Sequence, residues 1–299
     1  MTNGNSLVNL GDLSKPATVL IEKISEAIGA AWAPHQIRRV ARAEADARII
    51  TAAADLEISE IQKRGLERLI REEGKRQENI ESITAQAAAQ LKDGAKPEGM
   101  DSDWIANFFD RSRNVSNAEM QSLWARLLAG EATTPGRYSR RTVDLIATLD
   151  KSDAALFTQL GSFVVLGSSP MPLVFESNGA IYGSHGINFS KLGHLDSLGL
   201  IRFDGIQTFV MNDLSQGVSM SYFGSIIAIN FKQPTGNSLD CGHVMLTKAG
   251  EELFPICGAR PDPAFIPYML EKFRATGHEA QLIVPQPTIT VTANLNPKK

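Results

Sequence analysis

The feature that most constrains this 299-residue chain is a long segment with the composition of a helix. From Pro34 to Leu91 there is no further proline, and glycine occurs only at Gly65 and Gly74. The stretch to Lys92 holds 11 Lys/Arg and 10 Asp/Glu. One continuous helix of that length would extend about 88 Å. Because such a helix cannot be buried in one globule, the sequence predicts two or three helical pieces forming a hairpin, a coiled-coil arm or an oligomer stalk.

A dense run of charge lies inside this segment, at Lys63–Arg76. Its basic residues could form a nucleic-acid patch. Glu67, Glu72 and Glu73 lie among these basic residues. Many of the opposite charges are at i,i+4 spacing, which favours ion pairs within the helix and a solvated helix face. A patch of apolar residues accompanies the run: Ile58, Ile61, Leu66, Leu69 and Ile70.

The middle of the chain predicts short capped helices. Asp103 caps a helix over Asp103–Arg113 that points Trp104 and Phe108 inward. Ser116 and Glu119 form a capping box for a second helix, and Gly130 supplies its left-handed end. Two further helices are predicted at Ser139–Leu149 and Ser152–Val164.

A small basic cluster, Arg137, Arg140 and Arg141, lies between these helices. It could hold a phosphate or contact a partner. Because Asp144, Asp150 and Asp153 are close in sequence, an ion-paired surface is the stronger interpretation.

The segment Ser116–Phe157 carries the pattern LWARLLAGE, then a turn containing PG, then a helix leading into an acidic Leu/Asp/Ala/Phe stretch. It resembles an uncharacterised bacterial family of unknown function and, more distantly, the alpha-type abortive-infection proteins of phage defence. Ala33–Ala47 fits the same group. The resemblance implies a bacterial cytoplasmic protein with a part in phage defence or stress, and it brings no catalytic residues with it.

The back half has the composition of strands and turns. Gly161–Arg260 holds 14 of the 24 glycines. Asn178-Gly179 predicts a hairpin between strands Leu173–Ser177 and Ala180–Ser184. The other predicted elements are a helix at Asn188–Ser197 and strands at Leu200–Phe203, Ile206–Val210 (its partner), Ser219–Phe223, Ile226–Phe231 and Val244–Leu246, the last leading into a helix capped by Thr247.

Lys191–Phe203 (KLGHLDSLGLIRF) and Val244–Phe254 (VMLTKAGEELF) resemble the end of a winged-helix domain. Members of that family often place the corresponding helix in the DNA major groove. The candidate contacts would be Lys191, His194 and Arg202. Gly161–Arg260 holds 5 Lys/Arg against 7 Asp/Glu, a local charge of −2, which disfavours phosphate binding. Nucleic acid therefore remains an alternative to a protein partner.

Catalytic and metal motifs give no support to an enzyme. The strings GxxxxGK[ST], GxGxxG, HExxH and GxSxG do not occur. His185, His194, Cys241, His243 and Cys257 could be assembled into a metal site or a nucleophile pair only by arbitrary choice. No catalytic, cofactor or metal site is predicted.

One amphipathic segment, Pro16–Trp32, is a candidate for membrane contact. It would either lie on the surface of a bilayer or pack against the rest of the protein. The two cysteines suit a reducing cytosol, and the first dozen residues are not expected to act as a secretory signal. At the other end Asp262-Pro263 begins a short helix that Gly277 ends. The tail with Ile289 and Val291 is an edge strand, a strand added to a partner's sheet, or disordered.

Together these patterns predict an α+β protein with long N-terminal helices, a helical middle and an elaborated winged-helix-like part. The expected divisions are residues 1–99, 100–165, 166–260 and 261–299. The favoured function is a non-catalytic bacterial assembly or sensor protein, acting as a homo-oligomer or with a helical partner. A nucleic-acid-binding regulator and a peripheral membrane protein are the alternatives.

Overall fold

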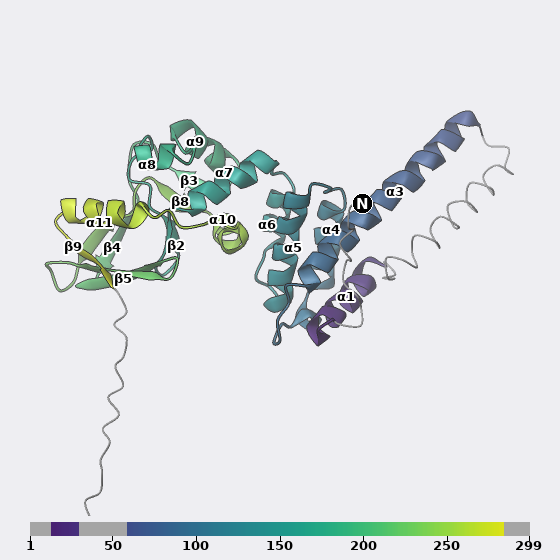
Figure 1. Ribbon diagram of the computed structural model, residues 1–299, viewed down its shortest axis with the longest axis horizontal. Helices are drawn as coiled ribbons and strands as arrows, with labels where there is room; N and C mark the ends of the chain where they lie inside the picture. The colour runs from purple at the N-terminus through teal and green to yellow at the C-terminus, as the bar shows by residue number, and fades with distance from the viewer. Residues whose placement is uncertain (1–12, 30–58, 284–299) are drawn as a thin grey trace, which may run out of the picture. The chain divides into compact units, whose positions relative to one another are not determined.

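The computed structural model describes residues 13–29 and 59–283, which form two compact units (Figure 1). The helical unit contains the described residues up to Phe157 together with Ser197–Leu200 and Thr247–Gly258, and the mixed unit contains Thr158–Asp196, Ile201–Leu246 and the described residues from Ala259 onward. Helices and strands are both present, as the α+β prediction requires. The division does not follow the chain in simple succession, because two later segments return to the helical unit.

Several predictions fall outside the described residues. These are the helix between Pro34 and Ile58, the Ala33–Ala47 pattern, the end of the amphipathic segment after Gly29, and the tail with Ile289 and Val291. Within the described ranges, the charged run Lys63–Arg76 is helical as expected.

The helical unit is made of α1 (Lys15–Ile28), α3 (Glu60–Ala88), the short 3-10 turn η2 (Pro97–Gly99), α4 (Ser102–Ser112), α5 (Ala118–Thr133), α6 (Arg140–Ile146), the start of α7 (Lys151–Gly161), α10 (Lys248–Leu253) and η3 (Phe254–Ile256). Its core is aromatic. The Phe108 ring stacks on Trp104 at 5.2 Å and meets Trp124 of α5 edge-on at 5.1 Å. The predicted inward positions of Trp104 and Phe108 are confirmed.

The apolar face of α1 is used for packing inside the helical unit. Ala17, Leu20, Ile21 and Ile24 are buried, and α1 contacts α4, η2 and α3. Gly29 ends the helix with a φ of 65°. The described part of the amphipathic segment is therefore covered by neighbouring helices.

Two predicted N-caps were wrong by one or two residues. The carboxylate of Asp101, not that of Asp103, accepts the Trp104 amide at 2.7 Å and caps α4. The side chain of Asn117 caps α5, so the capping box of Ser116 is not formed. Because neighbouring polar residues can all act as caps, the local pattern leaves the choice to the path of the incoming chain.

Gly130 was also misassigned, because α5 continues past it to Thr133. A Cβ atom at Gly130 would lie 2.6 Å from the Tyr138 hydroxyl oxygen and 2.7 Å from a ring carbon. The Tyr138 side chain is buried. Gly130 thus admits the tyrosine ring against the helix and does not terminate it.

The mixed unit contains one five-stranded sheet, two small ladders and short helices. The sheet has the order β2 (Pro170–Pro172), β1 (Val164–Leu166), β5 (Gly217–Tyr222), β6 (Ser225–Asn230) and β9 (Glu279–Ile283), all antiparallel. The ladders pair β3 (Ile201–Phe203) with β8 (Val244–Leu246) and β4 (Val210–Leu214) with β7 (Asn237–Asp240). The helices are α8 (Ala180–Gly183), α9 (Phe189–Ser197) and α11 (Phe265–Ala275).

Along β5, β6 and β9, one face of the five-stranded sheet is covered and the other is open. Met220, Ile227 and Ile229 alternate along β5 and β6 on the covered face and are buried. The Tyr222 ring on that face lies 5.3 Å from Phe265 of α11. Figure 1 shows α11 along one side of the sheet. The alternation is typical of a half-exposed antiparallel sheet.

The predicted hairpin at Asn178-Gly179 was wrong. Gly179 has a φ of −62° and begins α8, whereas the hairpin turn favoured by Asn-Gly needs positive φ. The Tyr182 hydroxyl donates to the Leu173 carbonyl at 2.8 Å and accepts the Phe175 amide at 3.2 Å. This buried tyrosine therefore holds the segment in a helical turn.

The helix capped by Asn188 and the strands at β3, β5, β6 and β8 are confirmed within one or two residues. The partner of β3 was wrong, because β3 pairs with β8, about 40 residues later, and not with Ile206–Val210. The segment between β3 and β8 pairs elsewhere, because β5 and β6 join the five-stranded sheet and β4 pairs with β7.

Candidate interaction surfaces

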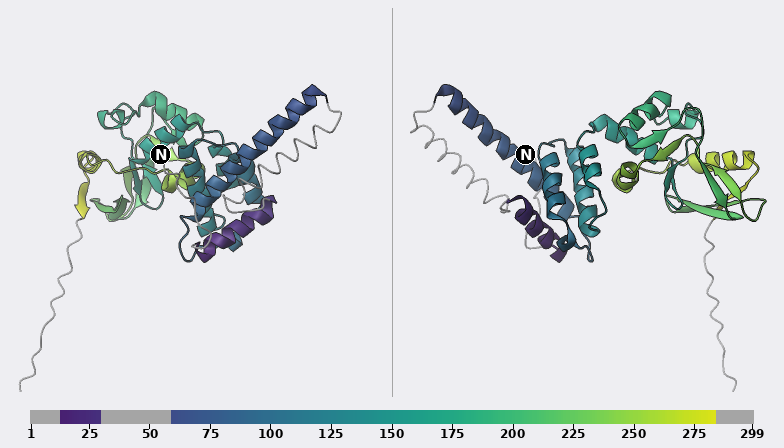
Figure 2. Two further views of the ribbon diagram at one scale, coloured as in Figure 1. Left: turned by 45° about the vertical axis from the view of Figure 1, so that its right-hand side comes forward. Right: turned by 180° about the vertical axis from the view of Figure 1, so that it is seen from behind.

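The N-terminal part of α3 buries no residue. The buried residues of this helix begin at Asn79, although the helix begins at Glu60 after a capping box of Ser59 and Gln62. Two large apolar side chains are exposed on this stretch, Ile61 at 74% and Leu69 at 51%. Figures 1 and 2 show the later half of α3 beside α4 and α5, and its first half extending beyond them. We call Glu60–Glu78 the α3 arm.

Some charges of the α3 arm pair with one another along the helix. Arg68 lies 3.6 Å from Glu72, and Arg76 pairs with Glu73. These i,i+3 and i,i+4 pairs lie on an exposed part of the helix, which agrees with the interpretation of a solvated face. Ile61 and Leu69 are the large apolar side chains that the arm could pack against a partner.

The base of the arm is fixed by buried amides. Asn79 donates to the Arg113 carbonyl at 2.8 Å, and Gln121 of α5 donates to the Asn79 side-chain oxygen at 3.1 Å. Ser82 in turn donates to Gln121 at 2.9 Å. Because these polar groups are buried and bonded, they set the rotation of α3 on α5 and therefore the direction in which the arm points.

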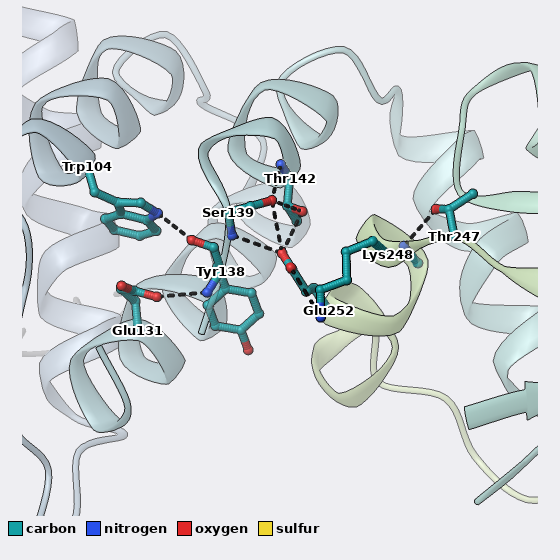
Figure 3. Close-up of polar contacts among 9 residues, drawn as sticks. Trp104, Glu131, Tyr138, Ser139, Thr142, Thr247, Lys248 and Glu252 are labelled. Atoms are coloured by element: carbon teal, nitrogen blue, oxygen red, sulfur yellow. Dashed lines mark hydrogen bonds and ion pairs between the residues drawn. The ribbon is translucent and has the colours of Figure 1, made fainter. Parts of the chain in front are cut away.

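Two buried carboxylates organise the loop between α5 and α6 (Figure 3). Glu131 accepts the amides of Gly136 at 2.6 Å and Tyr138 at 2.9 Å. Glu252 of α10 accepts the Ser139 amide at 3.0 Å and the Thr142 hydroxyl at 2.6 Å. The loop is thus held from both sides, by α5 and by a segment more than a hundred residues later.

Burial raises the pKa of the Glu131 carboxyl above its ordinary value, and the two amide hydrogen bonds act in the opposite direction. The sequence analysis did not select Glu131 or Glu252. A signal existed for the first: Glu131 follows Leu127 and Leu128 at helical spacing, on the apolar side of its helix. The second could not be found, since nothing local links α10 to Ser139.

The arginine cluster predicted as a contact site lies at this loop. Arg137, Arg140 and Arg141 are exposed. The Arg137 guanidinium lies 5.4 Å from the centre of the Tyr138 ring. Arg140 pairs with Asp101 at 3.2 Å, close to the start of α4. The cluster is therefore engaged in part with its own protein.

Arg140 is ion-paired, as the interpretation of an ion-paired surface requires, but its partners are not the aspartates closest in sequence. Arg140 uses Asp101 and Asp103, which precede it by almost forty residues. Asp144 instead lies 2.8 Å from Arg111 of α4. These ion pairs follow from the packing of α6 on α4 and not from proximity in sequence.

Lys191, His194 and Arg202 are exposed in the mixed unit. Lys191 and His194 are on α9, whereas Arg202 is on β3, opposite Met245 of β8. Acidic groups accompany them, since Asp196 also lies on α9 and accepts the Phe203 amide at 3.2 Å. The three cations therefore lie in one unit, and the carboxylate of Asp196 is on the helix that carries two of them.

The histidines and cysteines considered for a metal site lie apart. His243 bonds the backbone oxygens of Asp204 and Gln207. Cys241 and Cys257 are buried, free of disulfide, and in different units. Burial raises the pKa of the Cys241 thiol to about 11. Within the described residues, no group of three or more His, Cys, Asp or Glu side chains is placed to hold a metal ion.

Sequence reasoning also missed a polar junction in the mixed unit. His185 lies between Gln159 at 2.9 Å and Asp262 at 2.8 Å. The Tyr222 hydroxyl accepts the Asp262 amide at 2.7 Å and donates to the Ser162 carbonyl at 2.8 Å. These bonds join α7, the start of α11 and β5, and every ring nitrogen has a partner. We interpret the junction as structural.

Across the described ranges, none of the helices has both the length and the apolar composition needed to cross a bilayer.

Comparison with known proteins gives a family but no activity. The family model described as "Protein of unknown function (DUF2806)" matches residues 63–270, which spans most of both units. No curated protein and no solved structure matches the chain.

Proposed function

The chain belongs to the DUF2806 family, and on that premise we propose that it is a non-catalytic assembly protein that self-associates through the α3 arm. The observation that carries the proposal is the arm itself. It is a helical stretch of five turns that buries no side chain yet exposes Ile61 and Leu69.

Physical chemistry makes an unpartnered arm costly. Helices gain most of their stability in proteins from packing an apolar face, and short isolated helices are marginal in water. Burying an exposed leucine or isoleucine contributes roughly 1.5–3 kcal/mol. A partner that covers Ile61 and Leu69 would therefore stabilise both the contact and the helix.

The charges of the arm favour a second copy as that partner. Glu60–Glu78 holds 6 Lys/Arg and 5 Glu, interspersed along the helix. A like-for-like helix in antiparallel orientation meets this mixture with a similar mixture, whereas a strongly acidic or basic partner would leave charges unmatched. The function that follows is assembly of copies into a larger complex.

Sedimentation measurements on the full chain test the proposal. The wild-type chain, 32.5 kDa as a single copy, is expected to sediment as an assembly. Leu69→Lys places a charge in the contact and is expected to lower the measured mass, with an unchanged circular dichroism spectrum because Leu69 is exposed in the single chain. The matched control is Ala89→Lys, an apolar-to-lysine change at the exposed end of the same helix. Equal masses for the wild type and Leu69→Lys would remove the α3 arm as the contact.

A second candidate function is nucleic-acid binding by the mixed unit. The supporting observation is that α8, α9, β3 and β8 follow in the order expected for a winged-helix-like fold, with Lys191 and Arg202 exposed. The local charge of −2 weighs against it. Gel-shift assays at about 50 mM salt decide the question, since absence of binding at low salt would remove this candidate.

Two narrower parts of the proposal have separate tests. A role in phage defence or stress rests on the resemblance of Ser116–Phe157 and Ala33–Ala47, and phage plating with and without the protein tests it. Peripheral membrane contact through α1 would require its buried face to leave α4. Liposome flotation with and without residues 16–32 measures whether that occurs.

A further inference from the structure

The open face of the five-stranded sheet carries an apolar row in register. Leu166 of β1 lies opposite Ser221 of β5, Ser221 opposite Ile226 of β6, and Ile226 opposite Ile283 of β9. Leu166, Ile226 and Ile283 are 45%, 42% and 41% exposed. Directly opposite residues have Cβ atoms about 5 Å apart, so Ile226 and Ile283 are neighbours, and the small side chain of Ser221 lies between Ile226 and Leu166. We call Leu166, Ile226 and Ile283 the sheet row.

The surroundings of the sheet row are almost free of charge. The next row on the same face is Ser219, Ala228 and Gln281, which are uncharged. Over the open face of β5, β6 and β9 the only charged side chain is Glu279, at the end of β9. The solvated face of an antiparallel sheet is normally polar, whereas this face exposes Leu166, Ile226 and Ile283.

We propose that a second copy of this chain packs its own sheet row against this one, face to face. The lack of charge argues for that occupant. Nucleic acid, acidic lipid surfaces and charged peptides would find no counter-charge here, whereas a neutral apolar stripe is complementary to itself. A two-fold axis through the face places each copy's row on the other's, at the about 10 Å spacing of packed sheets.

This interface is independent of the α3 arm and goes beyond it. The two surfaces belong to different units of the chain. We expect the two surfaces to contact different copies, and each copy then binds two others. The expected wild-type species therefore contains more than two copies.

Single-surface variants test the inference. Ile226→Lys is expected to reduce the sedimentation mass of the full chain to that of the complex held by the α3 arm alone. Combined with Leu69→Lys, it is expected to give single chains of 32.5 kDa. The matched control is Ile206→Lys, at a side chain 92% exposed in the same unit and away from the sheet. A mass change with Leu69→Lys but none with Ile226→Lys overturns the sheet interface and leaves the proposed function standing. A mass change with Ile226→Lys but none with Leu69→Lys overturns the α3 arm as the contact and leaves the sheet interface standing.

A labelling experiment separates a second copy from other occupants. In an Ile226→Cys chain the natural thiols, Cys241 and Cys257, are buried, so a thiol reagent reports on the sheet row. A labelling rate that rises as the protein is diluted supports the second copy. A rate that does not depend on concentration overturns it, and faster labelling after truncation beyond Ile283 would then identify residues 284–299 of the same chain as the cover.

Discussion

At the scale of single residues, side chains far apart in sequence fix the local structure of the helical unit. The Trp104 indole donates to the Tyr138 carbonyl at 2.8 Å, and the Tyr138 ring occupies the space left by Gly130. Glu131 and Glu252 then hold the same loop by its amides. The sequence identified the aromatic positions, which follow helical periodicity. It did not identify the glycine's role, because the ring that Gly130 admits comes from another segment.

Two glycines in helices are expected to respond in opposite directions to alanine. Gly130→Ala forces the buried Tyr138 ring to move and is expected to destabilise the protein by roughly 1–3 kcal/mol, the usual cost of overpacking. Gly65→Ala in α3 meets no atom within 4 Å and is expected to stabilise by about 0.5–1 kcal/mol. Denaturant unfolding measures both. A Gly130→Ala protein as stable as the wild type would contradict the close packing.

Glu131 gives a pH dependence with a definite sign. Burial raises the pKa of its carboxyl in the folded state, so the folded protein binds this proton more tightly than the unfolded chain does. The corresponding contribution to stability is present below the unfolded pKa, about 4.5, and is lost as pH rises through the folded value. We expect the unfolding free energy of the wild type relative to Glu131→Gln to fall over that interval. A difference that rises with pH would contradict the assigned direction.

At the scale of elements, helix beginnings depend on one chosen cap among several possible ones. Asn117→Ala is expected to destabilise α5, and with it the protein, by about 1 kcal/mol, because the asparagine accepts the amides of Glu119 and Met120. Ser116→Ala is the control and should be close to neutral. Thermal unfolding of the two variants separates them, and a larger loss for Ser116→Ala would restore the capping box.

Strands show the same division between local and distant information. Alternating apolar residues located β5 and β6, and a short run located β8, because these patterns follow from the two-residue period of a strand. The pattern does not show which strand pairs with which. The hairpin predicted from Asn178-Gly179 became α8 when the Tyr182 hydroxyl bonded Leu173 and Phe175, which shows a tertiary contact prevailing over turn propensity.

At the scale of the whole molecule, the two proposed contacts make assembly the unifying expectation. The α3 arm is in the helical unit and the sheet row is in the mixed unit, and neither involves a catalytic group. Arg140, one of the exposed charged candidates from the sequence, is paired with Asp101, so the apolar exposures are the stronger candidate contacts. Sedimentation of the single and double variants therefore measures both contacts in one series.

The α+β class, the helical α3 segment and the aromatic core positions could all be predicted from local patterns, because they depend on composition and on contacts within a few residues. Only the tertiary structure decided which residues cap α4 and α5, that β3 pairs with β8, and that α10 anchors the loop through Glu252. It also decided which apolar residues stay exposed, including the sheet row. Exposure depends on what lies opposite a residue in space, and that partner is set by segments that no local pattern connects.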